Sequence, residues 1–276
     1  MMLIAQISDL HIKRPGKLAY GRVDTAAYLT RCIAQLNALD PRPDAVLITG
    51  DLVDFGDAEE YAYLQSLLAP LELPYYLCVG NHDGRDALRE VFADHTYLRE
   101  HPRFVQYALD LGALRVVVAD TQDPPHGGGR LCAERLDWIA RTLADGDARP
   151  TLLAMHHPPF ACGIEHMDAQ RLAPDDAAKL AGIVVKHPEI ERVLCGHVHR
   201  AIQTRFAGTI ASVCPAPAHQ VALDLRANGP SRFVMEPPAF LLHRHVEGEG
   251  VVTHTAYIGD HGGTYPFYDD DHALID

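Results

Sequence analysis

The sequence has no apolar run that approaches the ~20 residues needed to span a bilayer, so no transmembrane helix is predicted. Its first segment, MMLIAQISDLHIK, lacks the charged start and the long apolar stretch of a signal peptide. We therefore expect a cytoplasmic protein that is not attached to a membrane.

Cysteines are few and show no metal-binding or redox spacing. The chain has six, and none stands in a CxxC pair. Cys78 and Cys195 lie inside apolar runs, where a free cysteine behaves as a small hydrophobic residue. The pattern favours a reducing compartment and a fold without disulfides.

An excess of basic residues is also missing. Asp and Glu number 37 against 24 Lys and Arg, which gives a formal net charge of −13. Proteins that bind nucleic-acid polymers do so largely through clustered positive charge, so we expect no such partner. The acidic balance does not exclude a small phosphate substrate held by local cations.

What the chain does contain is a regular alternation of apolar runs and segments with helical spacing. The runs at 3–9, 44–51, 74–83, 151–160 and 191–200 are expected to be strands, and the segments at 24–39, 57–71, 86–95, 133–145 and 174–187 are expected to be helices. Asp24 or Thr25 is a suitable N-cap for the first helix. This alternation predicts an α/β layered fold.

After residue 200 the pattern changes, and strands alone are expected. The segments 240–246 and 251–258 alternate in hydrophobicity on either side of Glu247–Gly250, which predicts a hairpin. A two-stranded hairpin is marginal on its own, so it must join its own sheet or that of a partner. We divide the chain into a main part, 1–220, and a C-terminal β extension, 221–276, which serves as a cap or in oligomerisation.

Polar residues of metal-binding types stand where five of the expected strands end. In open α/β sheets, ligands bind at the edge formed by the carboxyl ends of the strands. Because side chains alternate along a strand, Asp9 should share a face with His11, and His197 with His199. The full set is Asp9, His11, Asp51, Asn81, His82, Asp83, His156, His157, His197 and His199.

These residues offer imidazole nitrogens, carboxylate oxygens and an amide oxygen, but no thiolate. Such a set suits zinc, iron, manganese or cobalt. Six or seven ligands exceed what one ion uses, so two ions that share a bridging carboxylate are predicted. Taken singly, each block has a simpler interpretation as a turn, a helix cap or a buried histidine. The prediction depends on their joint occurrence at strand ends.

The five blocks resemble the signature of the calcineurin-like metallophosphoesterases. They are Asp9-Leu10-His11, Gly50-Asp51, Gly80-Asn81-His82-Asp83, His156-His157 and Gly196-His197-Val198-His199, in the family's order. The segments PDAVLITGDLVDFGDAEEY and CGHVHR are similar to the bacterial glycerophosphodiesterases and class III cyclic nucleotide phosphodiesterases. The resemblance implies a four-layer αββα sandwich, with the C-terminal β extension added to it.

Matching the motifs block by block implies a ligand for each position of a two-metal centre. The first ion would be held by Asp9, His11 and His199, the second by Asn81, His156 and His197, and Asp51 would bridge them. His157 is the alternative to His156. The metals implied are two divalent or trivalent ions of iron, manganese, zinc or cobalt.

The resemblance implies a metal-dependent phosphoric diester hydrolase. A hydroxide held between the ions would attack phosphorus in a small diester, such as a glycerophosphodiester or a 3′,5′-cyclic nucleotide. Asn81 and His82 would contact the phosphate, and His82 could protonate the leaving alkoxide. A phosphomonoesterase of the same superfamily and a metal-free scaffold protein are the alternatives.

The substrate side is less defined by sequence. Tyr20 either covers the site or packs under its own loop, and His219 either faces the substrate or lies on the surface. The loops 123–130 and 162–170 are expected to shape the pocket. Relatives use their C-terminal segments in dimers, so a homo-oligomer with the hairpin at its interface is expected.

Overall fold

Two β-sheets face each other in the computed structural model, which describes residues 2–275. The first has the order β13-β12-β1-β2-β3 and contains β1 (Met2–Ile7), β2 (Ala45–Thr49), β3 (Tyr75–Cys78), β12 (Ala239–Val246) and β13 (Gly250–Tyr257). The second has the order β4-β5-β6-β7-β9-β8 and contains β4 (Tyr107–Leu111), β5 (Leu114–Val118), β6 (Thr151–Ala154), β7 (Ile190–Cys195), β8 (Ile202–Phe206) and β9 (Thr209–Val213).

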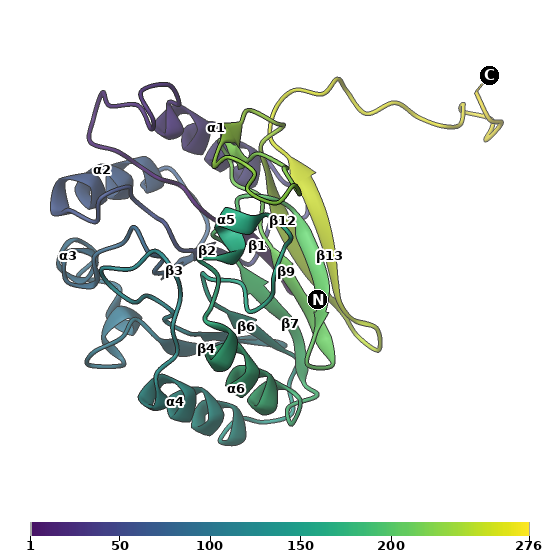
Figure 1. The fold of residues 1–276 in the computed structure, drawn as a ribbon. Coiled ribbons are helices and arrows are strands. Elements are labelled where there is room, and N and C mark those ends of the chain that lie inside the picture. Colours follow the sequence, from purple (N-terminus) through teal and green to yellow (C-terminus); the bar gives the residue numbers. More distant parts are fainter. Residues whose placement is uncertain (1, 276) are drawn as a thin grey trace.

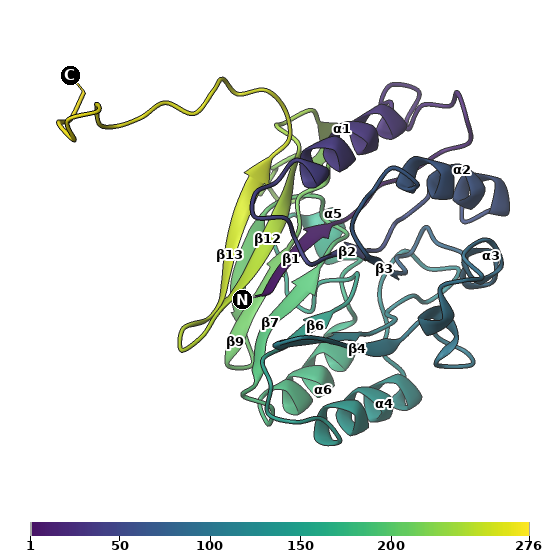
Figure 2. The same ribbon diagram turned by 180° about the vertical axis from the view of Figure 1, so that it is seen from behind.

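Helices cover the outer faces of both sheets (Figures 1 and 2). The first sheet is covered by α1 (Thr25–Asn37), α2 (Ala58–Leu68) and α3 (Arg85–Val91), and the second by α4 (Ala133–Ala144) and α6 (Pro174–Val184). The short elements are η1 (Thr96–Arg99), α5 (Glu165–Asp168) and the small β10 (Gln220–Val221) and β11 (Phe233–Val234) pair. The predicted α/β fold with four layers is confirmed.

The helices begin where the sequence provides caps. The side chain of Asp24 accepts a hydrogen bond of 3.0 Å from the Ala27 backbone nitrogen in α1. The side chain of Asp57 accepts one of 3.0 Å from the Glu60 backbone nitrogen in α2. Each carboxylate satisfies an otherwise unpaired N–H of a first turn. Of the two N-caps suggested for α1, Asp24 is therefore the one used.

A continuous apolar core joins the two sheets. Ile4 and Leu77 of the first sheet and Tyr107 and Val116 of the second are all buried in one cluster, together with Phe240 of β12. Full burial of such side chains stabilises the fold by ~1.5–3 kcal/mol each. The sheets are therefore held face to face along the strands that lead to the site.

Parallel pairing brings the relevant strand ends to one edge. β1, β2 and β3 are parallel neighbours, and so are β5, β6, β7 and β9. The carboxyl ends of neighbouring parallel strands meet at the same side of a sheet. The segments that follow β1, β2, β3, β6 and β7 therefore lie near one another.

The C-terminal hairpin belongs to the first sheet of its own chain. β12 pairs antiparallel with β1, with Met2 opposite His245 and Gln6 opposite Leu241, and β13 forms the outer edge. The predicted hairpin and its turn between Val246 and Gly250 are confirmed. The expected extension 221–276 thus contributes two strands to a sheet that also carries site residues. Beyond β13 the chain runs away from the body (Figure 1).

One structural result bears on the membrane. Among residues 2–275, no helix combines the length and the apolar character that crossing a bilayer would require.

Candidate metal centre

The site residues lie in loops just past the strands, in a strained backbone conformation. β1 ends at Ile7 and β7 ends at Cys195, so the polar residues follow the strands and are not part of them. Non-glycine residues with positive φ are uncommon, and they cluster at functional sites where the surrounding structure holds them. Five of the site residues have such positive φ values: 57° for Asp9, 45° for His11, 48° for Asp51, 73° for His197 and 56° for His199.

This backbone corrects one prediction. Strand alternation was expected to point His197 and His199 the same way, but neither residue is in a strand. His199 lies with Asp9 and His11, whereas His197 lies with His156 and His157. The left-handed residues turn the chain sharply enough to deliver the two histidines to different clusters.

The first cluster consists of Asp9, His11 and His199, which are all buried. His199 Nε2 lies 3.4 Å from Asp9 Oδ1 and 3.2 Å from His11 Nε2. Three potential ligand atoms from two loops thus converge on one point.

The second cluster brings His156 and His197 together with His157, and Asn81 borders it. His156 Nε2 lies 3.2 Å from Asn81 Oδ1. The Nε2 of His197 is buried and has no hydrogen-bond partner in the chain. A buried polar atom without a partner is costly, so this nitrogen indicates a ligand that the protein alone does not supply.

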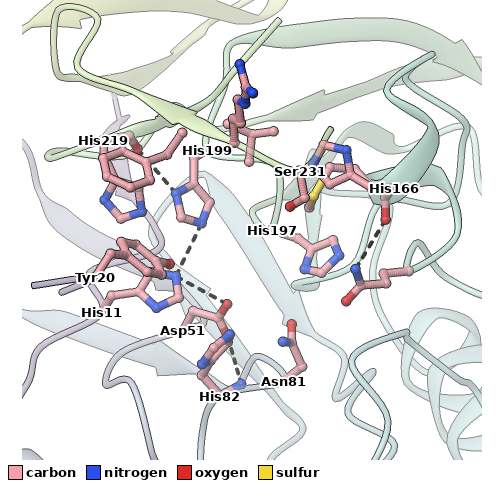
Figure 3. Close-up of a pocket in the computed structure, with 15 residues that line it drawn as sticks. His11, Tyr20, Asp51, Asn81, His82, His166, His197, His199, His219 and Ser231 are labelled. Atoms are coloured by element: carbon pink, nitrogen blue, oxygen red, sulfur yellow. Dashed lines mark hydrogen bonds and ion pairs between the residues drawn. The ribbon is translucent and has the colours of Figure 1, made fainter. Parts of the chain in front are cut away.

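Asp51 lies between the two clusters. Its Oδ2 is 3.6 Å from His11 Nε2 and 3.3 Å from His156 Nε2, while its Oδ1 accepts a hydrogen bond of 2.9 Å from the His82 backbone nitrogen. One carboxylate therefore reaches both sides, and Figure 3 shows it beside His11 of the first cluster.

Hydrogen bonds orient the histidine rings. His156 Nδ1 lies 2.9 Å from the Thr49 carbonyl oxygen, and His199 Nδ1 lies 3.2 Å from the His219 carbonyl oxygen. Histidines that bind metals characteristically donate their other ring N–H to such an acceptor. The Nε2 atoms are thereby left to face the centre of the site.

Asp54 is a residue that the sequence analysis missed. Its Oδ1 lies 3.1 Å from His11 Nδ1, its backbone oxygen lies 2.8 Å from His82 Nδ1, and its Oδ2 is bonded to Lys13. Burial alone would raise the pKa of Asp54, but the hydrogen bonds to His11 and Lys13 outweigh it and lower the pKa. In the sequence, the only indication of a role for Asp54 at the site was its position three residues after Asp51.

The choice between His156 and His157 has a geometric basis. His157 Nδ1 lies 2.8 Å from the Thr121 hydroxyl, and its Nε2 lies 3.1 Å from the Gly127 carbonyl oxygen. Both ring nitrogens of His157 thus contact groups outside the proposed ligand set, whereas His156 Nε2 lies 3.2 Å from Asn81 Oδ1 and 3.3 Å from Asp51 Oδ2. The geometry favours His156 as the ligand, with His157 packed behind it.

The centre of the site attracts positive charge. Burial by itself would lower the pKa of His156, but the Asp51 carboxylate outweighs it and the pKa rises to about 9. By contrast, burial and the neighbouring His11 lower the pKa of His199 to about 3. His199 is thus a neutral imidazole, and a bound cation would displace the proton of His156 and compensate the buried carboxylates, so the donor set fits two metal ions.

Three glycines allow the loops to approach this closely. A Cβ added at Gly50 would lie 2.5 Å from His156 Nδ1, one at Gly80 would lie 2.2 Å from Asp51 Oδ1, and one at Gly196 would lie 2.1 Å from Ser8 Oγ. The glycine at the start of each of these three polar blocks is therefore required for space.

Gly80→Ala is expected to displace Asp51, because the new methyl group would also lie 2.5 Å from the Asp51 backbone nitrogen, which cannot swing aside. A shift of ~1 Å in a catalytic constellation costs on the order of 10²-fold in rate. The measurement is kcat on a diester together with bound metal. Gly182→Ala in α6, where nothing lies within 4 Å, is the matched control and should keep full activity. Wild-type activity in Gly80→Ala would contradict the packing described here.

A cavity of about 340 Å³ opens over the two clusters. Figure 3 shows Tyr20 and His219 on the side of His199, with His82 beside Asp51 and Asn81. The lining residues are His11, Tyr20, Asp51, Asn81, His82, His166, Met167, Gln170, His197, His199, His219, Val221, Ser231, Arg232 and Phe233.

The structure removes one of the two alternatives for each substrate-side residue. His219 is only 1% exposed, so its interpretation as a surface residue is wrong. Tyr20 is 55% exposed and lines the cavity, and its ring stacks on Phe233 with centroids 5.1 Å apart. It therefore stands over the site and does not pack beneath its own loop.

The two loops expected to shape the pocket also differ. Loop 162–170 contributes His166, Met167 and Gln170 to the lining, as predicted. No residue of 123–130 is among the lining residues of the described chain, because that loop packs behind the site and holds His157 through Gly127. Ser231, Arg232 and Phe233 were missed, since the sequence after residue 220 carries no recognisable motif.

Known proteins resemble this chain over most of its length. Residues 2–201 match the model of the family described as calcineurin-like phosphoesterase. A protein named as a probable glycerophosphodiester phosphodiesterase, from Arcobacter nitrofigilis, is 39% identical over 275 residues and is matched over 100% of both chains. A protein named as a probable cyclic nucleotide phosphodiesterase, from Rhodopseudomonas palustris, is 34% identical over 97% of both chains.

A solved structure supports the fold. A dimetal phosphatase from Danio rerio superimposes with a TM-score of 0.63 over 94% of this chain and 99% of its own, at 12% sequence identity. Since the family match spans well over half of the sequence and the identity to full-length relatives is high, the chain belongs to the calcineurin-like phosphoesterase family.

Proposed function

We propose that this chain is a two-metal phosphodiesterase that hydrolyses small diesters, namely glycerophosphodiesters and 3′,5′-cyclic nucleotides. The observation that carries the proposal is the position of Asp51, whose Oδ2 lies within 3.6 Å of a ligand nitrogen in each cluster. The relatives named for glycerophosphodiesters and for cyclic nucleotides support the substrate class.

The proposed ligands are divided between two ions. Asp9, His11 and His199 would hold the first, Asn81, His156 and His197 the second, with Asp51 shared. A set of nitrogen and oxygen donors without thiolates suits iron, manganese, zinc or cobalt. When bound, two such ions lower the pKa of a water molecule and neutralise charge on phosphoryl oxygens.

The chain's own residues would orient the diester and move a proton. Asn81 and His82 border the cavity next to Asp51, where the phosphate would bind. The Nδ1 of His82 lies 2.8 Å from the Asp54 carbonyl oxygen and donates a proton there, so in the imidazolium form the second proton, on Nε2, faces the substrate. We assign His82 as the acid that protonates the leaving alkoxide. His219 and Tyr20 would contact the substituents of the phosphate.

The test is a matched panel of substrates with the metal content measured in parallel. We expect hydrolysis of glycerophosphoethanolamine and of cyclic AMP, and slower hydrolysis of glycerol 3-phosphate. A preference for the monoester would support a phosphomonoesterase instead. A pure protein without bound transition metal and without activity would indicate a scaffold.

We further propose a division of labour along the chain. Residues 1–220 would carry the metals and the chemistry. The extension 221–276 would cap the site through Ser231, Arg232 and Phe233 and would mediate association through β13. All six cysteines are free thiols, which suits a reducing compartment.

The proposed association is a homodimer formed by the edges of two β13 strands. β13 is an eight-residue outer strand, GVVTHTAY, that pairs with β12 without a break and has no Lys, Asp, Glu or Pro. Natural proteins protect long exposed edges with such residues, with bulges, or by covering them. Glu191 and Arg192 of the same chain already bond to the backbone of Val251, so a second copy would pair with the part of the edge beyond Val251 and extend the sheet.

A solution mass of about twice 30.4 kDa is therefore expected by light scattering at micromolar concentration. His254→Lys, which adds a charge on the exposed part of β13, should shift the mass to that of one chain. His261→Lys adds the same charge beyond the strand and should leave the dimer intact. A wild-type monomer at these concentrations would refute the proposed interface.

A further inference from the structure

Two fully buried polar side chains lie within the first sheet, far from the solvent and outside the proposed ligand set. They are Gln6 of β1 and His243 of β12, and both are 0% exposed. A buried polar group is costly unless its hydrogen bonds are made, so such groups call for an account of their partners.

The partners of His243 fix its protonation. Its Nε2 lies 3.0 Å from Gln6 Oε1, and its Nδ1 lies 2.9 Å from the Thr253 hydroxyl. An amide oxygen only accepts, so Nε2 carries the proton and the hydroxyl donates to Nδ1. Burial, with a contribution from Arg192, lowers the pKa of His243 to about 3, which keeps the ring neutral. His243 therefore holds the Gln6 amide in one orientation.

The amide nitrogen of Gln6 joins the two sheets. It donates to the Thr49 hydroxyl at 2.9 Å and to the Cys195 carbonyl oxygen at 3.1 Å. Thr49 is the last residue of β2 in the first sheet, and Cys195 is the last residue of β7 in the second. One amide group thus ties together the ends of strands from both sheets.

Both connections lead to the second cluster. The Thr49 carbonyl oxygen accepts from His156 Nδ1 at 2.9 Å, and Cys195 is followed directly by Gly196 and His197. Neither connection makes a hydrogen bond to His11 or His199, although the His197 backbone nitrogen also donates to Asp9 Oδ1 at 2.9 Å. The orientation of the amide is therefore coupled to the ligands of one ion more than to those of the other.

We propose that Gln6 and His243 are positioning residues that hold His156 and His197 at the separation required by the second ion. This rests on the metal assignment in the proposed function. Loss of the His243 imidazole leaves Gln6 Oε1 without its donor, so the amide turns and releases Thr49 or Cys195. The C-terminal hairpin, which lies beyond the matched residues 2–201, is thereby part of the machinery that shapes the metal centre.

The experiment titrates the metal-free, full-length protein with Mn²⁺ and measures free Mn²⁺ by electron paramagnetic resonance. The variants are His243→Leu and Gln6→Met, which remove the contacts. His243→Gln retains a donor and an acceptor and is the rescue. Thr151→Val removes a buried hydroxyl that bonds to the Arg149 carbonyl oxygen at the opposite end of β6, and it serves as the stability-matched control.

Wild type and Thr151→Val should bind two ions. His243→Leu and Gln6→Met should bind the first ion normally and the second ~10-fold more weakly. Loss of a residue that hydrogen-bonds to a metal ligand lowers metal affinity by roughly 10- to 100-fold, and the smaller value is expected here. His243→Gln should bind both ions nearly as wild type. If both disrupting variants bind two ions like the control, or lose both ions equally, the proposal is wrong. A wild-type protein that binds fewer than two ions refutes the metal assignment itself.

Discussion

Replacement of Asp51 by alanine is expected to lower metal occupancy at both sites at once. Asp51 Oδ2 lies 3.6 Å from His11 Nε2 and 3.3 Å from His156 Nε2, so one carboxylate serves both clusters. Metal ions contribute several kcal/mol of charge stabilisation to phosphoryl transfer, which predicts a rate loss on the order of 10³-fold or more. The measurement is metal stoichiometry by mass spectrometry, together with kcat on a diester.

His11→Ala provides the contrast, because His11 belongs to the first cluster alone and its loss should affect mainly one ion. Asp137→Ala removes an exposed carboxylate from α4 and should change neither occupancy nor rate. Two ions bound with wild-type affinity in Asp51→Ala would show that the bridging assignment is wrong.

Replacement of His82 by alanine is expected to lower the rate of hydrolysis by a factor that depends on the leaving group. An alkoxide leaves poorly unless it is protonated, and general-acid catalysis contributes ~10²–10⁴-fold. His82→Ala should therefore lose that factor on a glycerophosphodiester. The loss should be much smaller on bis(4-nitrophenyl) phosphate, because nitrophenolate departs without a proton. Steady-state rates on the two diesters, at equal metal occupancy, measure the difference.

If His82 only binds the phosphate, both substrates should lose similar factors. Equal losses would remove the acid role and leave His82 as a binding residue. The control is His126→Ala, an exposed histidine in the loop 123–130 that does not line the cavity.

The residues that form the two clusters were predictable from sequence because each follows an apolar run that had to be a strand. Parallel strands deliver their carboxyl ends to one edge, so Asp9, Asp51 and His156 could be expected together before any coordinates existed. The bridging role of Asp51 and the division of ligands between two ions came from the family resemblance, and the distances around Asp51 are consistent with both.

What could not be predicted depends on contacts between distant segments. The φ of 73° at His197 sends it away from His199, and the strand pattern does not specify that turn; only the family resemblance assigned the two histidines to different ions. Asp54 gains its place from contacts with His11 and Lys13, which precede it by about forty residues. The pairing of β12 with β1 joins opposite ends of the chain, and a hairpin pattern does not reveal which sheet it enters.

Two metal ions in this chain are proposed to support diester hydrolysis. The direct measurement is the rate of glycerophosphodiester hydrolysis by the metal-free protein as Mn²⁺ is added back, with bound Mn²⁺ counted in the same samples. No activity is expected without metal, and full activity is expected only as the second ion per chain binds. Full activity in the metal-free protein, or an activity that is complete with one ion bound, would contradict this proposal.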